Sequence, residues 1–393
     1  MTYLRLKNTV DLVSGENGYL LIDSLSGKLF DIELYESALI GRILRGNTYE
    51  EIIDGNQRAE IFMQNLINMG LARKVNTKYY EEKIRTGQLS NDNIRSTLTL
   101  NTLVVQLPLS CTKGCKYCGE KLIFGCFMCE TSNEQFDSHT YKQLLAGLNK
   151  YKSLERLIIT GGDIFRHYDN VRILVKALGL MNGVEVTILN NMSNIDEKIV
   201  KDLLKNKIQL IIMIDMTKNN MQNETALYQE KRVLLDMLKD QVRYYIVVDQ
   251  ELEQTNLAIV EGVDKKRVQY CYTIKNKRQL IENATYKRGL HVTNAQQASM
   301  RAKLHPCLTG MLAIDKNMNV LPCLKMKDQV LSKVDFETVN LYRNRKGIEK
   351  HWLSPVKRYM KCASCKYNIT CMDCKAIESE YSSVYDKVCT RSL

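Results

Sequence analysis

The central part of the chain alternates between short apolar runs and longer stretches in which apolar residues recur at helical spacing. The runs have the length of β-strands, and the stretches between them have the period of amphipathic helices. Strands are expected at 103–107, 157–160, 184–189, 208–214, 243–248 and 267–272, with helices that include 141–148, 171–180, 196–204 and 226–238. Strands and helices in alternation predict an α/β fold, in which helices pack outside a parallel sheet.

The first 75 residues have another pattern, which predicts a separate module with a winged-helix-like fold. Short runs of strand character come first, and three stretches of helical character follow. The strands are expected at 10–13, 18–23 and 28–32, and the helices at 36–44, 49–53 and 58–69. Gly70 is placed to end the last helix. Residues 76–100 are polar and predict a linker with one short helix at most.

Length and charge set further limits. A chain of 393 residues is expected to form two or three domains. No apolar run approaches the roughly 20 residues that a membrane helix needs, and the N-terminus lacks the continuous apolar core of a signal peptide. We therefore expect a cytoplasmic protein with no membrane partner. The net charge of +12 permits nucleic-acid or acidic-peptide partners. Because no arginine-rich tract or aromatic-interleaved RNA motif is present, no nucleic acid is expected.

The chain contains 13 cysteines, which is many for a cytosolic protein, where disulfides rarely persist. Five lie between positions 111 and 129, seven lie between 307 and 389, and Cys271 stands alone. Clusters of this kind favour metal sites over a disulfide framework.

Cys111, Cys115 and Cys118 follow the first expected strand of the central region at Cys-x3-Cys-x2-Cys spacing. Four thiolates normally hold a 4Fe–4S cluster, so three on one tight loop leave one iron open to a small-molecule ligand. A zinc site would need a fourth ligand nearby, which Cys126 or Cys129 could supply. These two cysteines could also be redox thiols or apolar packing.

The cysteine loop, with Tyr117 before its last cysteine, resembles the signature of radical S-adenosylmethionine (SAM) enzymes. The resemblance implies a partial (β/α)6 barrel over residues 101–295. It also implies that the open iron binds the amino and carboxylate groups of SAM, which the cluster reduces to a 5′-deoxyadenosyl radical. The loop follows the carboxyl end of the first expected strand, and barrel enzymes place their chemistry at the carboxyl ends of their strands.

The next two expected strands end on residues that resemble the SAM-binding edges of this family. Gly161, Gly162 and Asp163 stand where the family has Gly-Gly-Glu-Pro, and Asn190 stands where it often has Thr-Asn-Gly. Paired glycines allow a backbone to approach a ligand closely, and a carboxylate can receive an ammonium group. The resemblance therefore implies that these four residues and Tyr117 bind SAM.

The fourth expected strand ends less clearly. Many relatives read Ser-x-Asp here, and this chain has Met213 and Asp215. Asp215 could face the active site or cap the end of its strand. No general base stands out, so no catalytic residue is assigned.

Residues 296–393 begin with Cys307 and an expected hairpin over 312–323, and they resemble the SPASM extension of peptide-modifying radical SAM enzymes. That extension carries two auxiliary 4Fe–4S clusters. By order, the resemblance implies that the outer cluster is held by Cys362, Cys365, Cys371 and Cys389, and the inner cluster by Cys307, Cys323 and Cys374.

Two features of this extension depart from the family. The family usually has a glycine where Met318 stands. The inner cluster is also one thiolate short, so an open iron could bind a thiolate of the substrate. Cys126, Cys129 or a non-cysteine group could instead complete it, and zinc sites are compatible with the Cys-x2-Cys pairs.

The N-terminal module resembles the leader-recognition (PqqD-like) domain of maturases for ribosomally made peptides, which implies that a leader adds a strand to the sheet edge. DNA binding and a structural cap are alternatives for this module. The leading hypothesis is a maturase that forms a cysteine thioether crosslink in a precursor peptide. It would need an external electron donor such as flavodoxin or ferredoxin. Carbon–carbon crosslinking, epimerisation and formylglycine-forming sulfatase maturation are alternatives, and a zinc-bearing nucleic-acid binder is the alternative from another class.

Overall fold

The structure is a computed structural model. It describes residues 1–16, 18–23, 25–78, 98–115, 117–120, 122, 129–133, 137–181, 183–217, 220–248, 263–273, 300, 303–355, 360–368, 371 and 374–377. Cys126, Cys389 and most of the expected linker lie outside these residues. None of the helices among the described residues is long and apolar enough to span a membrane.

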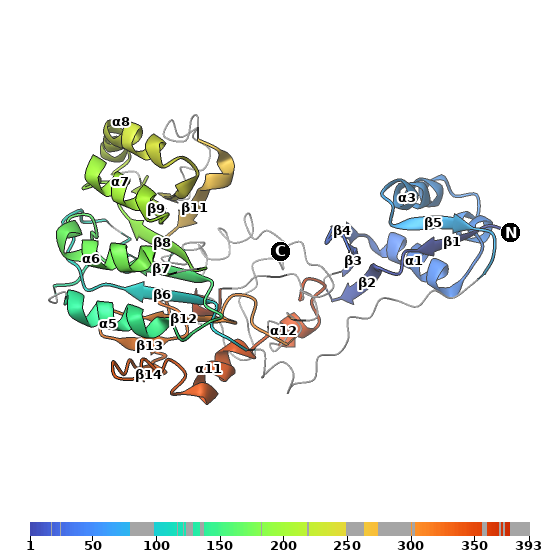
Figure 1. Ribbon diagram of the computed structural model, residues 1–393. Helices are drawn as coiled ribbons and strands as arrows, with labels where there is room; N and C mark the ends of the chain where they lie inside the picture. Colours follow the sequence, from blue (N-terminus) through green and yellow to red (C-terminus); the bar gives the residue numbers. More distant parts are fainter. Residues whose placement is uncertain are drawn as a thin grey trace.

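Residues 1–75 form a body of their own, shown in blue in Figure 1. Its strands are β1 (Tyr3–Leu6), β2 (Val10–Gly15), β3 (Gly18–Asp23), β4 (Leu29–Ile32) and β5 (Ala72–Val75), and its helices are α1 (Leu34–Arg45), α2 (Tyr49–Ile53) and α3 (Gln57–Asn68). Strands β2, β3 and β4 form an antiparallel sheet, while β1 pairs with β5. The expected strands and helices are confirmed, and Gly70 follows the end of α3 in the left-handed conformation. The pairing of β1 with β5 was not predicted.

The main sheet is parallel over seven strands. Six follow one another in order, and they are β6 (Thr102–Gln106), β7 (Arg156–Thr160), β8 (Glu185–Asn190), β9 (Gln209–Asp215), β10 (Val242–Val248) and β11 (Val268–Tyr272). The seventh, β12 (Met311–Ile314), lies parallel to β6 on its other side. The predicted α/β architecture with a central parallel sheet is therefore confirmed, and each expected strand is present within a few residues.

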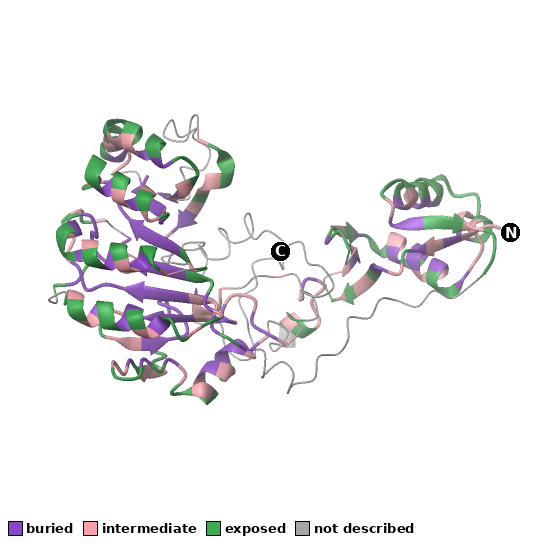
Figure 2. Cartoon of the chain, viewed as in Figure 1, coloured by how far each residue is buried: buried purple, intermediate pink, exposed green. Residues whose placement is uncertain are grey.

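Helices follow the strands as the alternation predicts. They are α5 (Ser138–Leu148), α6 (Tyr168–Gly179), α7 (Glu197–Lys205) and α8 (Met221–Leu238). Aspartates cap α5 and α7, because the Asp137 and Asp196 carboxylates accept hydrogen bonds from backbone N–H groups of the first turn. The strands are buried, and the outer faces of the helices are exposed (Figure 2).

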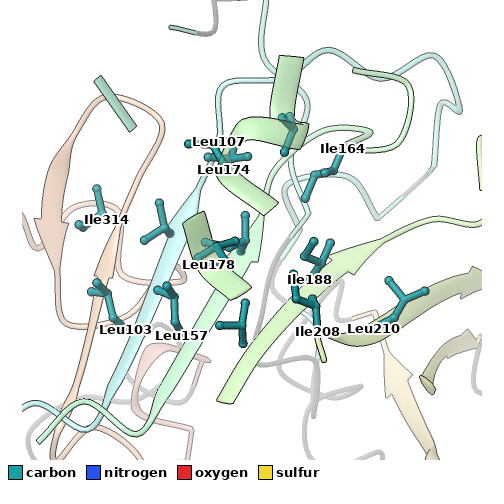
Figure 3. Packing of buried hydrophobic residues seen from close by; sticks show 14 of the residues in the cluster. Leu103, Leu107, Leu157, Ile164, Leu174, Leu178, Ile188, Ile208, Leu210 and Ile314 are labelled. Carbon is teal, nitrogen blue, oxygen red and sulfur yellow. The ribbon is translucent and has the colours of Figure 1, made fainter. Parts of the chain in front are cut away.

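The two faces of the sheet pack against different partners, because successive side chains of a strand point to opposite faces. Leu103 and Leu157 belong to the large core that includes Leu178 of α6 (Figure 3). On the other face, Leu189 and Met213 pack in a smaller cluster together with Tyr117, Leu122 and partly buried cysteines. The cysteine loop thus lies over the face of the sheet that the helices leave uncovered.

The C-terminal part begins with the predicted hairpin. Its strands are β12 and β13 (Asn319–Leu321), and β14 (Ser332–Lys333) extends the sheet beyond them. Met318 in the turn has φ of 61°, a conformation that suits glycine better than a side chain with a Cβ. This explains the glycine of related proteins at this position. Helices α11 (Arg345–Trp352) and α12 (Met360–Ala363) follow.

The cysteine-rich segment around α12 contacts the sheet of the N-terminal body. The N–H of Glu16 donates to the carbonyl of Ser364 at 2.8 Å. The Tyr367 hydroxyl donates to the Asp31 carboxylate, and the Lys366 ammonium lies 2.7 Å from the same group. In Figure 1, α12 accordingly lies between the N-terminal body and the main sheet.

Candidate active site at the cysteine loop

A cavity of about 110 Å³ lies at the carboxyl ends of the central strands. The loop after β6 forms one wall, and residues at the ends of β8 and β9 contribute to the others. It is lined by Cys111, Gly114, Cys115, Tyr117, Cys118, Cys129, Thr131, Asn191 and Met213. The three cysteines of the predicted cluster loop therefore meet in one cavity, at the edge where the strand order predicts the chemistry.

The environment of these thiols fits an iron–sulfur cluster. Burial raises the pKa of Cys111, and it raises that of Cys115 to about 11, so the thiolates need a cationic partner. Backbone N–H groups already point at two of the sulfurs, from Thr131 to Cys118 Sγ at 3.4 Å and from Lys113 to Cys111 Sγ at 3.5 Å. Hydrogen bonds of this kind stabilise thiolates that ligate iron.

A mononuclear metal site is not preformed in the described part of the chain. No group of three or more His, Cys, Asp or Glu side chains in those residues could hold a single metal ion. Cys111, Cys115 and Cys118 line a cavity instead.

Cys129 is a fourth thiol in the same cavity. Its Sγ donates a hydrogen bond to the carbonyl oxygen of Gly162 at 3.2 Å, and its own carbonyl accepts from the N–H of Gly119 at 3.2 Å. Burial and the charges of the other three thiols raise its pKa well above the ordinary value. The sequence left its role open, and no local pattern links it to the loop eleven positions earlier in the chain.

The two glycines after β7 lie directly against the chain that enters the cysteine loop. Gly161 has φ of 112° and Gly162 has φ of 56°. A Cβ at Gly161 would overlap the carbonyl oxygen of Leu107, and one at Gly162 would overlap that of Leu109. Only glycine allows both the conformation and this close approach, so the Gly-Gly turn and the cysteine loop form one packed unit.

The family comparison adds the decisive observation, because residues 106–245 match the family model of the radical SAM superfamily. Residues 106–245 are therefore similar to a radical SAM domain. The matched residues include the cysteine loop, the Gly-Gly turn, β7–β9 and the first part of β10. No curated protein matches the chain.

Two solved structures of anSMEcpe agree on the fold. A histidine-tagged anSMEcpe structure with bound AdoMet covers 74% of this chain and 90% of its own, at 12% identity and a TM-score of 0.52. A native anSMEcpe structure with bound AdoMet and Cp18Cys peptide covers 73% and 92%, at 14% identity and a TM-score of 0.50. SuiB from Streptococcus suis bound to precursor peptide SuiA covers 100% of both chains, at 14% identity and a TM-score of 0.47.

Asp163 and Asn190 of the radical SAM domain are buried, and they bond to each other rather than line the cavity. The Asn190 amide donates to Asp163 Oδ1 at 3.2 Å and accepts from the N–H of Ile164 at 3.1 Å. The other oxygen of Asp163 accepts from the Asn194 amide at 2.6 Å. These bonds join the turn after β7 to the end of β8, and direct contact of either residue with SAM stays a prediction.

Asn191 and Thr131 line the cavity and were not selected from the sequence. The Asn191 amide lies 3.8 Å from Cys111 Sγ, and the Thr131 hydroxyl accepts from the Cys111 N–H at 2.9 Å. Tyr117 also lines the cavity, and its contact with SAM stays a prediction. The alternation of residues in β8 could have indicated Asn191, because adjacent residues point to opposite faces of the sheet.

The carboxyl end of β9 and the beginning of α8 form a polar network beside the cysteine loop. Asp215 accepts from the hydroxyl of Thr217 at 2.7 Å and the amide of Asn220 at 2.7 Å, so it caps the strand end, as one of the two interpretations predicted. Lys113 of the loop lies 2.7 Å from the Glu224 carboxylate, with side chains only 12% and 5% exposed. Burial raises the pKa of Glu224, although the Lys113 charge opposes this. The pair fixes the loop to α8.

Glu130 connects the cavity wall to the C-terminal hairpin. Its carboxylate lies 2.7 Å from the Lys327 ammonium and 3.6 Å from that of Lys316, and its carbonyl accepts from the Gly162 N–H at 2.8 Å. Burial alone would raise the pKa of the Glu130 carboxyl. The hydrogen bond from Lys327 and the positive charges of Lys327 and Lys316 outweigh this and lower the pKa below its ordinary value. The segment that carries Cys129 is therefore held from both sides.

Five of the described C-terminal cysteines fall into two groups by their packing. Cys307, Cys323 and Cys374 pack with the main core, whereas Cys365 and Cys371 pack with Tyr367 against the β2–β4 sheet. Cys362 is described but belongs to neither hydrophobic cluster. Their assignment to an inner and an outer auxiliary cluster stays a prediction, and Cys389 lies outside the described residues.

Proposed function

We propose that this protein is a radical SAM maturase that modifies a ribosomally made precursor peptide. The observation that carries the proposal is the cavity at the carboxyl edge of a parallel sheet, lined by Cys111, Cys115 and Cys118 within the region that matches the radical SAM family. The three cysteines would hold the cluster, and the Gly161–Gly162 edge would receive the methionyl end of SAM. When bound, the cluster and SAM supply a 5′-deoxyadenosyl radical that takes a hydrogen atom from an unactivated carbon.

The residues of the site would position this chemistry rather than carry out acid–base steps. Tyr117 and Met213 give the cavity apolar walls, which exclude water from a reactive radical. The Lys113–Glu224 pair would keep the loop fixed while the substrate carbon is held near SAM. A defined geometry between donor and acceptor is the main protein contribution to such chemistry.

The N-terminal body supports a peptide substrate. Its β2–β3–β4 sheet has β2 and β4 at the edges, and a leader peptide could add a strand to such an edge. The end of β2 is already engaged, because Glu16 bonds to Ser364. The segment that contains Ser364 contacts β4 through the Asp31 side chain and, among the described residues, not through a backbone hydrogen bond, so we assign the leader to the edge at β4. The Cp18Cys peptide bound to anSMEcpe agrees with a peptide substrate for a protein of this fold.

The division of the C-terminal cysteines supports two auxiliary 4Fe–4S clusters of the SPASM type. The inner set of Cys307, Cys323 and Cys374 is one thiolate short among the ligands assigned by order. An open iron there would bind a cysteine thiolate of the substrate, and this favours a thioether crosslink over a carbon–carbon bond. The surplus electron would pass through the auxiliary clusters to an external acceptor, and flavodoxin or ferredoxin would supply the reducing electron.

Anaerobic reconstitution tests the proposal. The protein should be brown and hold about twelve irons for three 4Fe–4S clusters, and a cysteine-containing precursor from a neighbouring gene should lose two hydrogens in mass spectra. Removal of residues 1–75 should abolish affinity for the precursor while SAM cleavage persists. A colourless protein with tightly bound zinc would contradict the proposal, and unchanged precursor affinity would refute the role of the N-terminal body.

A further inference from the structure

Cys129 occupies a position that the cysteine-loop motif does not explain. It lines the cavity with Cys111, Cys115 and Cys118, although the motif already provides the three ligands of a SAM-binding cluster. A 4Fe–4S cluster has four irons and accepts four thiolates. The cavity therefore contains one thiol for each iron.

We propose that Cys129 is the fourth ligand of this cluster in the absence of SAM, and that SAM displaces it. The inference rests on the proposed function, because it requires that the cavity hold a 4Fe–4S cluster. It assigns a ligand that the radical SAM motif lacks, and it makes the open iron a state that SAM produces rather than a permanent feature.

The backbone at Cys129 and Glu130 is bonded to the two places between which the thiol would exchange, the cysteine loop and the Gly-Gly turn. Its carbonyl is bonded to Gly119, just beyond the cysteine loop, and the next residue, Glu130, is bonded to Gly162 in the Gly-Gly turn. The Glu130 carboxylate is held in turn by Lys327. The backbone of Cys129 and of the residue after it is therefore held at two points.

The hydrogen bond from Cys129 to Gly162 gives the displaced side chain a second position. Cys129 Sγ donates to the Gly162 carbonyl at 3.2 Å, so this carbonyl can accept a hydrogen bond from the thiol when the thiol does not bind iron. As a ligand, Cys129 loses its proton to solvent and binds iron as thiolate. When the amino and carboxylate groups of SAM bind the iron, the thiolate leaves, takes up one proton and returns to Gly162. No electron is transferred in this exchange.

Such a ligand would protect the cluster when SAM is scarce. An iron with three cysteine ligands and an exchangeable fourth is the one that a cluster loses first on oxidation, which leaves a 3Fe–4S cluster. Cys129 would retain that iron until SAM arrives. The exchange would also restrict the open iron to complexes that already contain the cosubstrate.

The test measures formation of 3Fe–4S cluster by electron paramagnetic resonance during mild oxidation of full-length, reconstituted protein without SAM. The Cys129→Ala and Cys129→Ser variants should form it roughly tenfold faster than wild type or more, the scale of effects seen when metal-site residues are removed. Saturating SAM should return both variants to the wild-type rate. Serine keeps a hydrogen-bond donor to Gly162, so C129S separates ligation from packing.

Cys271→Ala is the matched control, because Cys271 is a buried thiol of the same apolar cluster but does not line the cavity. It should behave as wild type. Equal rates for wild type and both Cys129 variants without SAM would overturn the inference, as would a failure of SAM to protect the variants. If wild type itself holds no cluster or leaves SAM intact, the proposed function fails instead, so the two failures are distinguishable.

Discussion

Replacing Gly162 by alanine should destabilise the main domain more than an equivalent change at a glycine with free space around it. Gly162 has φ of 56°, and a Cβ there would overlap the carbonyl of Leu109. The left-handed conformation costs an alanine about 1–2 kcal/mol, and the forced shift of a packed backbone adds about 1–3 kcal/mol. The expected loss for G162A is therefore about 2–5 kcal/mol.

Gly183 provides the matched control, because its φ is 76° and no atom lies within 4 Å of an added Cβ. The Gly183→Ala variant meets only the conformational cost of about 1–2 kcal/mol. The difference of about 1–3 kcal/mol corresponds to roughly 2–12 °C in melting temperature for a domain of this size. Thermal unfolding of both cluster-free variants, followed by far-ultraviolet circular dichroism, measures it. If G162A and G183A have the same melting temperature, the Gly-Gly turn is not packed against the chain that enters the cysteine loop.

Three further changes test other parts of the structure. Lys113→Met leaves the Glu224 carboxylate buried without its partner, and it should lower the free energy of unfolding by about 3–5 kcal/mol in thermal unfolding. Lys198→Met breaks a pair whose side chains are 49% and 84% exposed, so it should lower that free energy by at most about 1 kcal/mol. Burial, with the charges of Lys375, Lys350 and His305, lowers the pKa of His351 to about 4. Stability should therefore fall by about 3 kcal/mol as pH drops from 6.5 toward 4, and His351→Gln should remove that slope in urea titrations. Tyr367→Phe removes the hydrogen bond to the partly exposed Asp31 carboxylate, which should lower the local stability by about 1 kcal/mol and speed hydrogen exchange in β4. An unchanged exchange rate in β4 would contradict the contact.

The elements of the fold could be predicted because their signals are local. Apolar runs marked the strands β6–β11, and Gly70 marked the end of α3. The missed features are strand pairings between segments that lie far apart in the sequence. Strands β1 and β5 are short and pair across most of the N-terminal body, and β12 joins β6 from about two hundred positions further along the chain.

The residues of the candidate site also divide into those that a local motif marks and those that only the fold brings together. Cys111, Cys115 and Cys118 could be selected because their spacing lies within one loop, and Gly161–Gly162 because a short motif marks the turn. Cys129 reaches the same cavity only through bonds to Gly119 and Gly162 that no spacing encodes.

A second limit is that one residue type can serve two purposes. Asp163 and Asn190 have the chemistry to bind SAM, yet in the structure they bond to each other and to the turn between them. Sequence identifies a carboxylate at a strand end, but it does not tell whether neighbouring amides already occupy that carboxylate. Asp215 is a similar case, since Thr217 and Asn220 satisfy it locally.

The most direct test of the account is cleavage of SAM by the purified protein. Reconstituted without oxygen and supplied with a low-potential reductant, wild type should convert SAM to 5′-deoxyadenosine and methionine, and so should the Cys271→Ala variant. Cys115→Ala, which removes one ligand of the cluster, should form neither product while keeping the iron of the auxiliary clusters. A wild-type protein that holds its iron yet leaves SAM intact would contradict the assignment of the cavity as a radical SAM site.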